Sequence, residues 1–407
     1  MKVKFPRRTL RDIDLTGQQV LLRADYNVPL DPDGNVADDF RLTASLPTLR
    51  SLLNKRCKIV IISHLGRPDG KIDAKYSLEP VAKVLSNLLQ KPVKFVNDCV
   101  GDKVKVAAKK MSAGDVILLE NLRFHAEEEA NDRDFARDLA RDSHVRYFVQ
   151  DGFGVVHRAH ASTSAITEFL PSVAGLLLER EYLAIKRATD DPVRPLTTVI
   201  GGAKISDKIE LVNRFVDVSD HVVIGGAMAN NFLEFLKYPI GDSLYEPGLD
   251  RTVQSIIHRA KDKYGSAFNG SFVIPTDVAV SENGDLNAPR LNVGLNQVTK
   301  HMKILDIGDL SIEKAVKVIT GSGTVIWNGT LGMAEATEFA HGSARVAMAL
   351  ASNPQITSVI GGGDTADFVR HWDALDGGSF THVSTGGGAS LELMAGETLP
   401  GIDALMK

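Results

Sequence analysis

An α/β fold with two domains, each built on a parallel sheet, is the fold class that this sequence predicts. Its 407 residues exceed what one hydrophobic core usually supports. Short apolar runs alternate with segments of helical periodicity, and the alternation pauses only near residues 170–195. Strands that alternate with helices form βαβ units, whose right-handed crossovers build parallel sheets. We therefore expect two Rossmann-like domains joined by a central helix and a hinge.

The first half of the chain predicts four buried strands, in the runs QQVLLRADYN, KIVIISHLGR, DVILLENLRF and VRYFVQDGFG. Apolar residues three or four positions apart predict two helices between them, and we assign these apolar faces to the core. The first helix is marked by Leu42, Leu46, Leu49 and Leu53, and the second by Leu78, Val81, Leu85 and Leu88.

Polar and cationic side chains follow these strands. Open α/β sheets bind ligands at the carboxyl ends of their strands, so the residues there are candidates for a binding site. Arginine suits this role because its guanidinium grips carboxylate or phosphate oxygens two at a time. One arginine alone would more simply be a solvated surface charge, but the same placement on four strands predicts a receptor for a small polyanion. The candidates are Asp25, Asn27, Arg41, His64, Arg67, Arg123, His157 and Arg158.

Glycine ends six apolar runs of the second half: LTTVIGGAK, HVVIGGAM, KILDIG, TVIWNG, ITSVIGGGD and HVSTGGGAS. Glycine between a strand and a helix lets the backbone approach a phosphate, and the helix then offers unpaired N–H groups. Many α/β loops need glycine only to make a tight connection, but six such turns predict a binding site for the phosphates of a nucleotide. Lys204 and Lys208 follow the first turn on one helical face. Asp364 and Thr365 follow the triple glycine, as a carboxylate for a metal ion and a hydroxyl at a helix start.

The boundary between the domains is expected in the segment PSVAGLLLEREYLAIKRATD, which we predict to form one long helix. Two prolines in the following DDPVRP break this helix. We therefore divide the chain into a first domain (1–172), a connecting helix and hinge (173–195), a second domain (196–389) and a carboxyl-terminal segment (390–407).

The composition favours a cytoplasmic protein that binds small molecules. A net charge of −4 offers no general attraction to nucleic acid or to membranes. No apolar run approaches the roughly 18 residues of a membrane span, and none of signal-peptide length follows the basic amino terminus. Cys57 and Cys99 are too few for a disulfide framework, and Cys57 is expected in the core. We expect neither nucleic acid nor membrane as a partner.

A protein that has one site for a small polyanion and another for nucleotide phosphates is suited to phosphoryl transfer. That reaction needs donor and acceptor oxygens held in line and the moving charge neutralised by cations, backbone N–H groups and magnesium. The sequence contains no Walker A loop and no protein-kinase motif set, and the first strand leads to RADYN instead of GxGxxG. A dehydrogenase on a related two-domain plan is therefore the weaker alternative.

Nine segments, in matching order and at similar spacing, resemble the phosphoglycerate kinases over essentially the whole chain. They are RADYNVPL, SHLGRP, LLENLRFH, DGFGVVHRAHAS, GGAKISDKI, IGGAMA, WNG, IGGGDT and STGGGASLE. The resemblance implies reversible phosphoryl transfer between 1,3-bisphosphoglycerate and ADP, giving 3-phosphoglycerate and ATP, with Mg²⁺. It also implies a carboxyl terminus that returns to the first domain, and a monomer whose domains close about the hinge to exclude water.

The resemblance also implies roles for individual residues. Arg41 would contact the transferring phosphoryl group and Lys204 would follow it, while Gly363 and Gly387 supply catalytic N–H groups from the glycine runs 361–363 and 386–388. The implied substrate-binding residues are Asp25, Tyr26, Asn27, Arg41, His64, Leu65, Gly66, Arg67, Arg123 and Arg158. The implied nucleotide-binding residues are Lys208, Gly308, Asn328, Glu335, Gly361, Gly362, Gly363, Asp364 and Thr365, and Asp364 is also the magnesium-associated carboxylate.

The histidines of the first domain need no catalytic role. A nucleotide phosphate attacks an acyl phosphate without a general base, so we interpret His64 as a donor that positions the ligand. His157 and His160 are expected to brace the substrate loop.

Departures from the family pattern lie on the nucleotide side. Asp309 stands in place of a proline, Ala227 in place of a glycine, and Thr330 and Ala334 belong to a changed segment before Glu335. Asp309 has two interpretations: an acceptor for a guanine edge that would favour GTP over ATP, or a solvent-facing cap of the helix beginning at the next residue. A non-catalytic binding protein on the same scaffold is a further alternative, although the phosphate-handling residues are all present.

Overall fold

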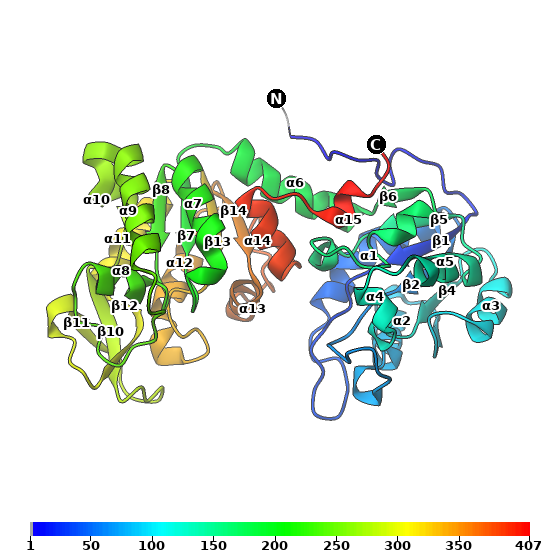
Figure 1. Ribbon diagram of the computed structural model, residues 1–407, viewed down its shortest axis with the longest axis horizontal. Coiled ribbons are helices and arrows are strands. Elements are labelled where there is room, and N and C mark those ends of the chain that lie inside the picture. The colour runs from blue at the N-terminus through cyan, green and yellow to red at the C-terminus, as the bar shows by residue number, and fades with distance from the viewer. Residues whose placement is uncertain (1–2) are drawn as a thin grey trace. The chain divides into compact units, whose positions relative to one another are not determined.

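The computed structural model describes residues 3–407, which divide into two compact units. The N-terminal unit comprises Lys4–Leu183 together with Thr398–Lys407, and the C-terminal unit comprises Ala184–Glu397 together with Val3. Each unit contains a six-stranded parallel sheet with helices packed on it (Figure 1). This is the predicted two-domain α/β architecture.

The sheet of the N-terminal unit has the strand order β3-β4-β2-β1-β5-β6, with every pair parallel. The four predicted strands are confirmed as β1, β2, β4 and β5, which are neighbours at the centre of the sheet. Their carboxyl ends therefore lie side by side. The strands are β1 (Gln19–Arg23), β2 (Lys58–Ile62), β3 (Val93–Val96), β4 (Val116–Leu119), β5 (Tyr147–Gln150) and β6 (Ser172–Ala174).

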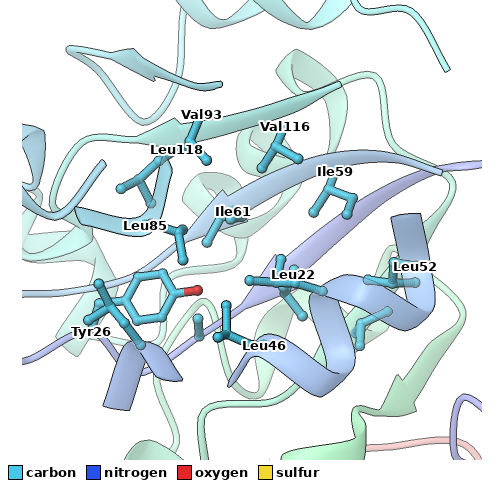
Figure 2. Close-up of a cluster of buried hydrophobic side chains, with 14 of the residues drawn as sticks. Leu22, Tyr26, Leu46, Leu52, Ile59, Ile61, Leu85, Val93, Val116 and Leu118 are labelled. Carbon is cyan, nitrogen blue, oxygen red and sulfur yellow. The ribbon is translucent and has the colours of Figure 1, made fainter. Parts of the chain in front are cut away.

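Both predicted helices of this unit are present, and their leucine stripes lie in the core. Figure 2 shows α1 packing Leu46 and Leu52 toward Leu22 of β1 and Ile61 of β2. Burying such side chains contributes about 1.5–3 kcal/mol each relative to exposure. The helices are α1 (Phe40–Asn54), α2 (Glu79–Leu89), α3 (Asp102–Lys109), α4 (Ala126–Glu129) and α5 (Arg133–Asp142).

The predicted long helix over residues 171–190 is wrong at its beginning. Residues Ser172–Ala174 form the edge strand β6, which pairs with β5, and the helix α6 spans only Leu176–Asp190. Gly175 separates the two elements, and its N–H donates to the carbonyl of Gln150 at 2.7 Å. The apolar run continues without interruption from strand into helix, so periodicity alone did not reveal the break.

The sheet of the C-terminal unit has the order β15-β14-β13-β7-β8-β9 and is also parallel throughout. Five of the six glycine-terminated runs supply its strands, as predicted. From β7 the chain adds β8 and β9 on one side of the sheet, and it adds β13, β14 and β15 on the other side. The carboxyl ends of β7 and β13 therefore form the topological switch point, where open α/β sheets bind ligands. The strands are β7 (Leu196–Ile200), β8 (His221–Ile224), β9 (Phe272–Val273), β13 (Thr324–Asn328), β14 (Thr357–Gly361) and β15 (His382–Val383).

The sixth run, KILDIG, does not belong to that sheet, and the prediction that strand–helix alternation continues without change is wrong here. Strands β10 (Asp277–Glu282), β11 (Leu291–Gly294) and β12 (Met302–Ile307) form a separate antiparallel sheet in the order β11-β10-β12. Asn283 and Gly284, directly after β10, both have positive φ, at 54° and 72°. An Asn-Gly pair is the strongest short-range signal for a hairpin turn, so the sequence did contain the information.

The helices of the C-terminal unit pack on its parallel sheet around the fully buried Trp327 and Phe215. Helix α7 contacts both α9 and α14, and α11 packs against α12. They are α7 (Ile209–Val218), α8 (Ala229–Phe235), α9 (Asp250–Tyr264), α10 (Phe268–Ser271), α11 (Asp309–Thr320), α12 (His341–Ala351), α13 (Gly363–Trp372) and α14 (Gly387–Ala395).

The carboxyl terminus returns to the N-terminal unit, as predicted. After the short helix α15 (Pro400–Asp403), drawn in red in Figure 1, the chain runs beside β6. Met406 donates its N–H to the carbonyl of Ser172 at 3.1 Å and accepts the N–H of Arg8 at 2.9 Å. None of the helices within residues 3–407 has the length and apolar character needed to cross a membrane.

Candidate active site

Asp25, Asn27 and Arg41 meet where β1 ends and α1 begins. The Nη1 atom of Arg41 lies 3.2 Å from the Asp25 carboxylate and donates to the Asn27 carbonyl at 2.8 Å. The side-chain oxygen of Asn27 accepts the N–H of Gly66 at 2.8 Å, which joins the loop after β1 to the loop after β2. The guanidinium of Arg41 is thus held on one side, and its remaining N–H groups can meet an anion.

His64, just after β2, is a neutral hydrogen-bonding group. Burial lowers its pKa well below the usual value, and the positive charges of Arg23, Arg123 and Arg41 lower it further. Its Nδ1 lies 3.3 Å from Nη2 of Arg23. A guanidinium can only donate, so Nδ1 accepts this bond and the ring hydrogen is on Nε2. His64 therefore has one N–H to offer, which is what a ligand-positioning donor requires.

Arg23 and Glu128 form a buried ion pair that the sequence analysis did not single out. The Oγ atom of Ser162 bridges them, accepting from Arg23 at 2.8 Å and donating to Glu128 at 2.6 Å. His160 lies 3.8 Å from the Glu128 carboxylate, and its pKa falls to about 4, chiefly through burial and then through Arg23. This network ties the loop after β5 to the end of β1. The sequence contained a signal for this ion pair, because Arg23 is the last residue of a buried strand and a buried charge needs a partner.

Three more arginines surround the same place. Arg123 donates to the Gly66 carbonyl at 2.8 Å, and Arg158 donates to Nε2 of His157 at 3.2 Å. Arg67 is exposed and makes no hydrogen bond within residues 3–407. Burial lowers the pKa of Arg123; a nearby glutamate opposes this, but Arg158 and Arg67 lower the pKa further. An anion would relieve this mutual repulsion, so the cluster favours a negatively charged ligand.

Tyr26 and Leu65 cannot offer side chains to a ligand there. Tyr26 is fully buried in the core (Figure 2), with its hydroxyl 3.0 Å from Oγ of Ser45. Leu65 is 3% exposed and belongs to the same apolar cluster. Only their backbone groups remain for the predicted substrate contacts, because both side chains fill the space under the sheet end.

In the C-terminal unit, Lys208 lies at the switch point of the sheet. Its Nζ donates to the carbonyl of Gly201 at 2.8 Å and to that of Asn328 at 3.4 Å, so it spans the ends of β7 and β13. Burial lowers the pKa of Lys208 to about 8, against the opposing charges of Asp364 and Asp207. A phosphate at this place would restore the stability of the ammonium form.

Two helix amino termini converge beside Lys208. A Cβ atom placed on Gly387, the first residue of α14, would lie 3.8 Å from the backbone nitrogen of Gly363, the first residue of α13. Gly362 precedes α13 at φ 90° and lies against Asn328, whose buried amide has no partner for either of its polar atoms. Thr365 accepts the Gly329 N–H at 2.6 Å. Unpaired N–H groups and an unpaired buried amide form a site for phosphate oxygens.

A cavity of about 360 Å³ lies next to these groups. Its walls are largely apolar and glycine-rich, with four acidic residues, Asp242, Asp306, Glu335 and Asp364, and one lysine, Lys303. Leu244 and Met333, 60% and 39% exposed, are two large apolar side chains of this lining on which a flat ring could pack. The cavity is lined, among others, by Gly202, Gly226, Ala227, Leu244, Thr330, Leu331, Met333, Glu335 and Asp364. The predicted nucleotide-binding residues Glu335 and Asp364 thus lie on the cavity, and so do the altered positions Ala227 and Thr330. The altered position Ala334 does not line it.

Asp306 is a second residue that the sequence analysis did not single out. Its carboxylate accepts the N–H groups of Ile307 and Gly342, both at 2.8 Å, and burial raises its pKa to about 7 despite these bonds. Met333 donates its N–H to the Leu305 carbonyl at 2.8 Å. The segment that carries Glu335 is thereby fixed to β12. A carboxylate inside the apolar run KILDIG was the signal for this contact.

Neither interpretation of Asp309 fits the structure. The helix α11 begins at Asp309 itself with Gly308 before it, and the N–H groups of Leu310 and the next residue donate to the Asp277 carboxylate at 3.0 and 2.8 Å. Asp309 instead pairs with Arg290 at 2.7 Å and does not line the cavity. The capping prediction is therefore wrong, and the guanine hypothesis has no geometric support. Gly308 also lies outside the cavity lining.

Comparison with known proteins supplies the family. Residues 10–397 match the family model of phosphoglycerate kinase. The phosphoglycerate kinase of Pelotomaculum thermopropionicum is 42% identical, covering 98% of this chain and 99% of that protein, and the one from Aquifex aeolicus is 43% identical over 97% of each. The solved phosphoglycerate kinase of Coxiella burnetii is 34% identical with a TM-score of 0.85 over 98% of each chain. The chain therefore belongs to the phosphoglycerate kinase family.

Proposed function

We propose that this phosphotransferase moves the acyl phosphoryl group of 1,3-bisphosphoglycerate to ADP, reversibly, with Mg²⁺, as a cytoplasmic monomer. The observation that carries the proposal is the division of phosphate chemistry between the units. Four neighbouring strand ends of the N-terminal unit gather arginines around one place. In the C-terminal unit, two helix amino termini and Lys208 converge at the switch point. Each is an anion site of a different shape, which suits a small acid and a nucleotide.

The acid substrate is assigned to the N-terminal unit. Arg67, Arg123 and Arg158 supply cations for its phosphate, and Arg41 is aimed by Asp25 at the group that moves. His64 donates through Nε2 to the bound acid, because Nδ1 is already engaged. The buried Arg23–Glu128 pair beneath them keeps these donors in place without touching the ligand.

The nucleotide is assigned to the C-terminal unit, with its base and ribose in the cavity and its phosphates at α13, α14 and Lys208. No cluster of three or more acidic, histidine or cysteine side chains that could hold a metal occurs within residues 3–407. Proteins usually hold magnesium through one or two carboxylates together with substrate phosphates. Asp364, exposed at the start of α13, is the carboxylate that would hold it. Magnesium, when bound, neutralises part of the phosphate charge.

The transfer itself asks little covalent chemistry of the protein. The attacking and leaving oxygens must be held in line, and charge on the moving phosphoryl group must be compensated. Arg41 and Lys204 supply that charge, and the N–H groups of Gly363 and Gly387 add fixed donors. Because the two sets of residues belong to different units, the units must close on each other, and closure excludes water from the acyl phosphate.

The experiment that tests this function is turnover by the purified chain with 3-phosphoglycerate and magnesium ATP in a coupled assay. We expect product formation that requires both substrates. Asp364→Ala should raise the magnesium concentration needed for half-maximal rate. Asp367→Ala, one turn further along the same helix and outside the cavity lining, should leave it unchanged. No turnover from folded wild-type protein would overturn the proposal and favour the non-catalytic alternative.

Nucleotide affinity should fall as the pH rises above about 8. Phosphates bind the charged form of Lys208, and burial has brought the pKa of this lysine down to about 8. Below that pH the ammonium is already formed; above it, binding must restore the proton, so the dissociation constant grows up to about tenfold per pH unit. Calorimetry with magnesium ADP from pH 7 to 9 measures this. Lys208→Arg, which stays charged, should flatten the curve, and an unchanged slope in that variant would count against the assignment.

A further inference from the structure

Lys204, the residue proposed to follow the moving phosphoryl group, has no side-chain anchor of its own. It lies in the loop between β7 and α7, is exposed, and makes no hydrogen bond within residues 3–407. A long lysine side chain loses much of its rotamer freedom when it is fixed. The direction in which Lys204 can reach is therefore set by whatever holds its backbone.

Glu246 holds that backbone from another loop. Two residues after Lys204, Ser206 donates its N–H to Oε2 of Glu246 at 2.9 Å and its hydroxyl to Oε1 at 2.5 Å. Partial burial raises the pKa of Glu246, but the hydrogen bonds from Ser206 and Ile205, together with the charge of Lys204, lower it overall. The carboxylate thus stays ionised near neutral pH and keeps both of its acceptor oxygens.

The loop that carries Glu246 is itself tied to helix α8. Asn231 accepts the Glu246 N–H at 3.2 Å and donates to its carbonyl at 2.6 Å, and the neighbouring Asn230 donates to the Leu244 carbonyl at 2.8 Å. Both asparagines are buried, at 5% and 0% exposure. The Lys204 loop is therefore connected through Glu246 to a fixed helix.

The same loop forms part of the nucleotide cavity. Asp242, Ser243 and Leu244 line it, and Leu244 is 60% exposed. A base that packs on Leu244 would contact this segment directly. Glu246, whose carboxylate holds the Lys204 loop, follows only two residues later. Occupation of the cavity and placement of the lysine thus share one short stretch of chain.

We propose that Glu246 is a positioning residue for Lys204, and that residues 242–246 link nucleotide binding to the orientation of this lysine. The inference rests on the proposed function. Glu246 touches neither substrate; it acts through Ser206 and the backbone. Misplacing a catalytic group by about 1 Å can cost a hundredfold in rate, so a partial loss of this hold should be visible in turnover.

The test is Glu246→Gln, which keeps the size of the side chain but removes its charge and one acceptor oxygen. We expect kcat to fall about tenfold, with the KM for 3-phosphoglycerate and the thermal midpoint within error of wild type. Asp250→Asn, the same chemical change at the first residue of α9, is the matched control and should leave kcat unchanged.

The decisive arm repeats Glu246→Gln in a Lys204→Ala background. If Glu246 acts through Lys204, the second substitution has no further effect on kcat. A second tenfold loss in that background, or a single variant with wild-type kcat, would overturn the inference. Wild-type turnover in the same assay separates this result from failure of the proposed function, since an inactive wild type would overturn both.

Discussion

Arg41→Ala should lower turnover about 10²–10³-fold, the usual effect of losing one donor aimed at developing charge. Its guanidinium is fixed by the Asp25 carboxylate and the Asn27 carbonyl, so its orientation is set before the substrate binds. Preorganised charge of this kind acts in the transition state more than in the ground state, so kcat falls more than KM rises. Steady-state kinetics with 3-phosphoglycerate and ATP measures both.

Arg50→Ala on the same helix is the control for Arg41. Arg50 is exposed in α1, and its side chain makes no hydrogen bond or ion pair within residues 3–407, so its loss should change neither kcat nor the melting temperature. If kcat of Arg41→Ala falls less than tenfold, Arg41 does not contact the transferring phosphoryl group. A large fall of its melting temperature would instead make the arginine a structural residue.

Gly226→Ala should destabilise the C-terminal unit by about 3 kcal/mol, from left-handed backbone strain and overpacking together. Gly226 has φ +64°, and an added Cβ would lie 2.4 Å from the backbone nitrogen of Gly202 and 2.8 Å from the carbonyl oxygen of Thr330. All of these neighbours are backbone atoms, which cannot rotate away. The displaced backbone lines the nucleotide cavity, so affinity for magnesium ADP should fall as well.

Gly17→Ala separates backbone strain from crowding. Gly17 has a similar φ, +71°, but nothing lies within 4 Å of the added Cβ. Its cost should therefore be strain alone, about 1–2 kcal/mol, with nucleotide affinity unchanged. Urea denaturation followed with and without magnesium ADP gives both quantities. Equal destabilisation by the two substitutions would mean that close backbone approach at Gly226 is unimportant.

Most of the fold was predictable because its elements are locally determined. Each central strand of the N-terminal unit is an apolar run of strand length followed by polar residues, and the leucine stripes of α1 and α2 fix the helices between them. The edge strand β6 was missed because Ser172–Ala174 has no turn residue on its far side except Gly175. The antiparallel sheet was missed although Asn283-Gly284 marked a hairpin.

The site was predictable only in its direct contacts. The sequence shows that cations such as Arg41 and Lys208 could bind a phosphate. It does not show which groups orient these side chains. The partners that aim these side chains lie far away in sequence: Glu128 for Arg23, the Asn328 carbonyl for Lys208, and Glu246 for the Lys204 loop. Such pairings depend on how strands are ordered in the sheet, which periodicity does not specify.

Asp309 shows the same limit, because here a local pattern suggested roles that the residue does not have. Its place beside a glycine at the end of an apolar run made it a plausible base contact or helix cap. The structure gives the capping role to Asp277, 32 residues earlier in the chain, and pairs Asp309 with Arg290. Tertiary hydrogen bonds replaced a local one, and no local pattern distinguishes the two.

The central claim is that the acid substrate and the nucleotide are held by separate groups of residues, one in each unit. Calorimetric titration of Arg67→Ala and Lys208→Ala with 3-phosphoglycerate and with magnesium ADP tests it most directly. We predict that Arg67→Ala loses affinity for 3-phosphoglycerate alone and Lys208→Ala for magnesium ADP alone. The reverse pattern, or loss of both ligands by either folded variant, would contradict the claim.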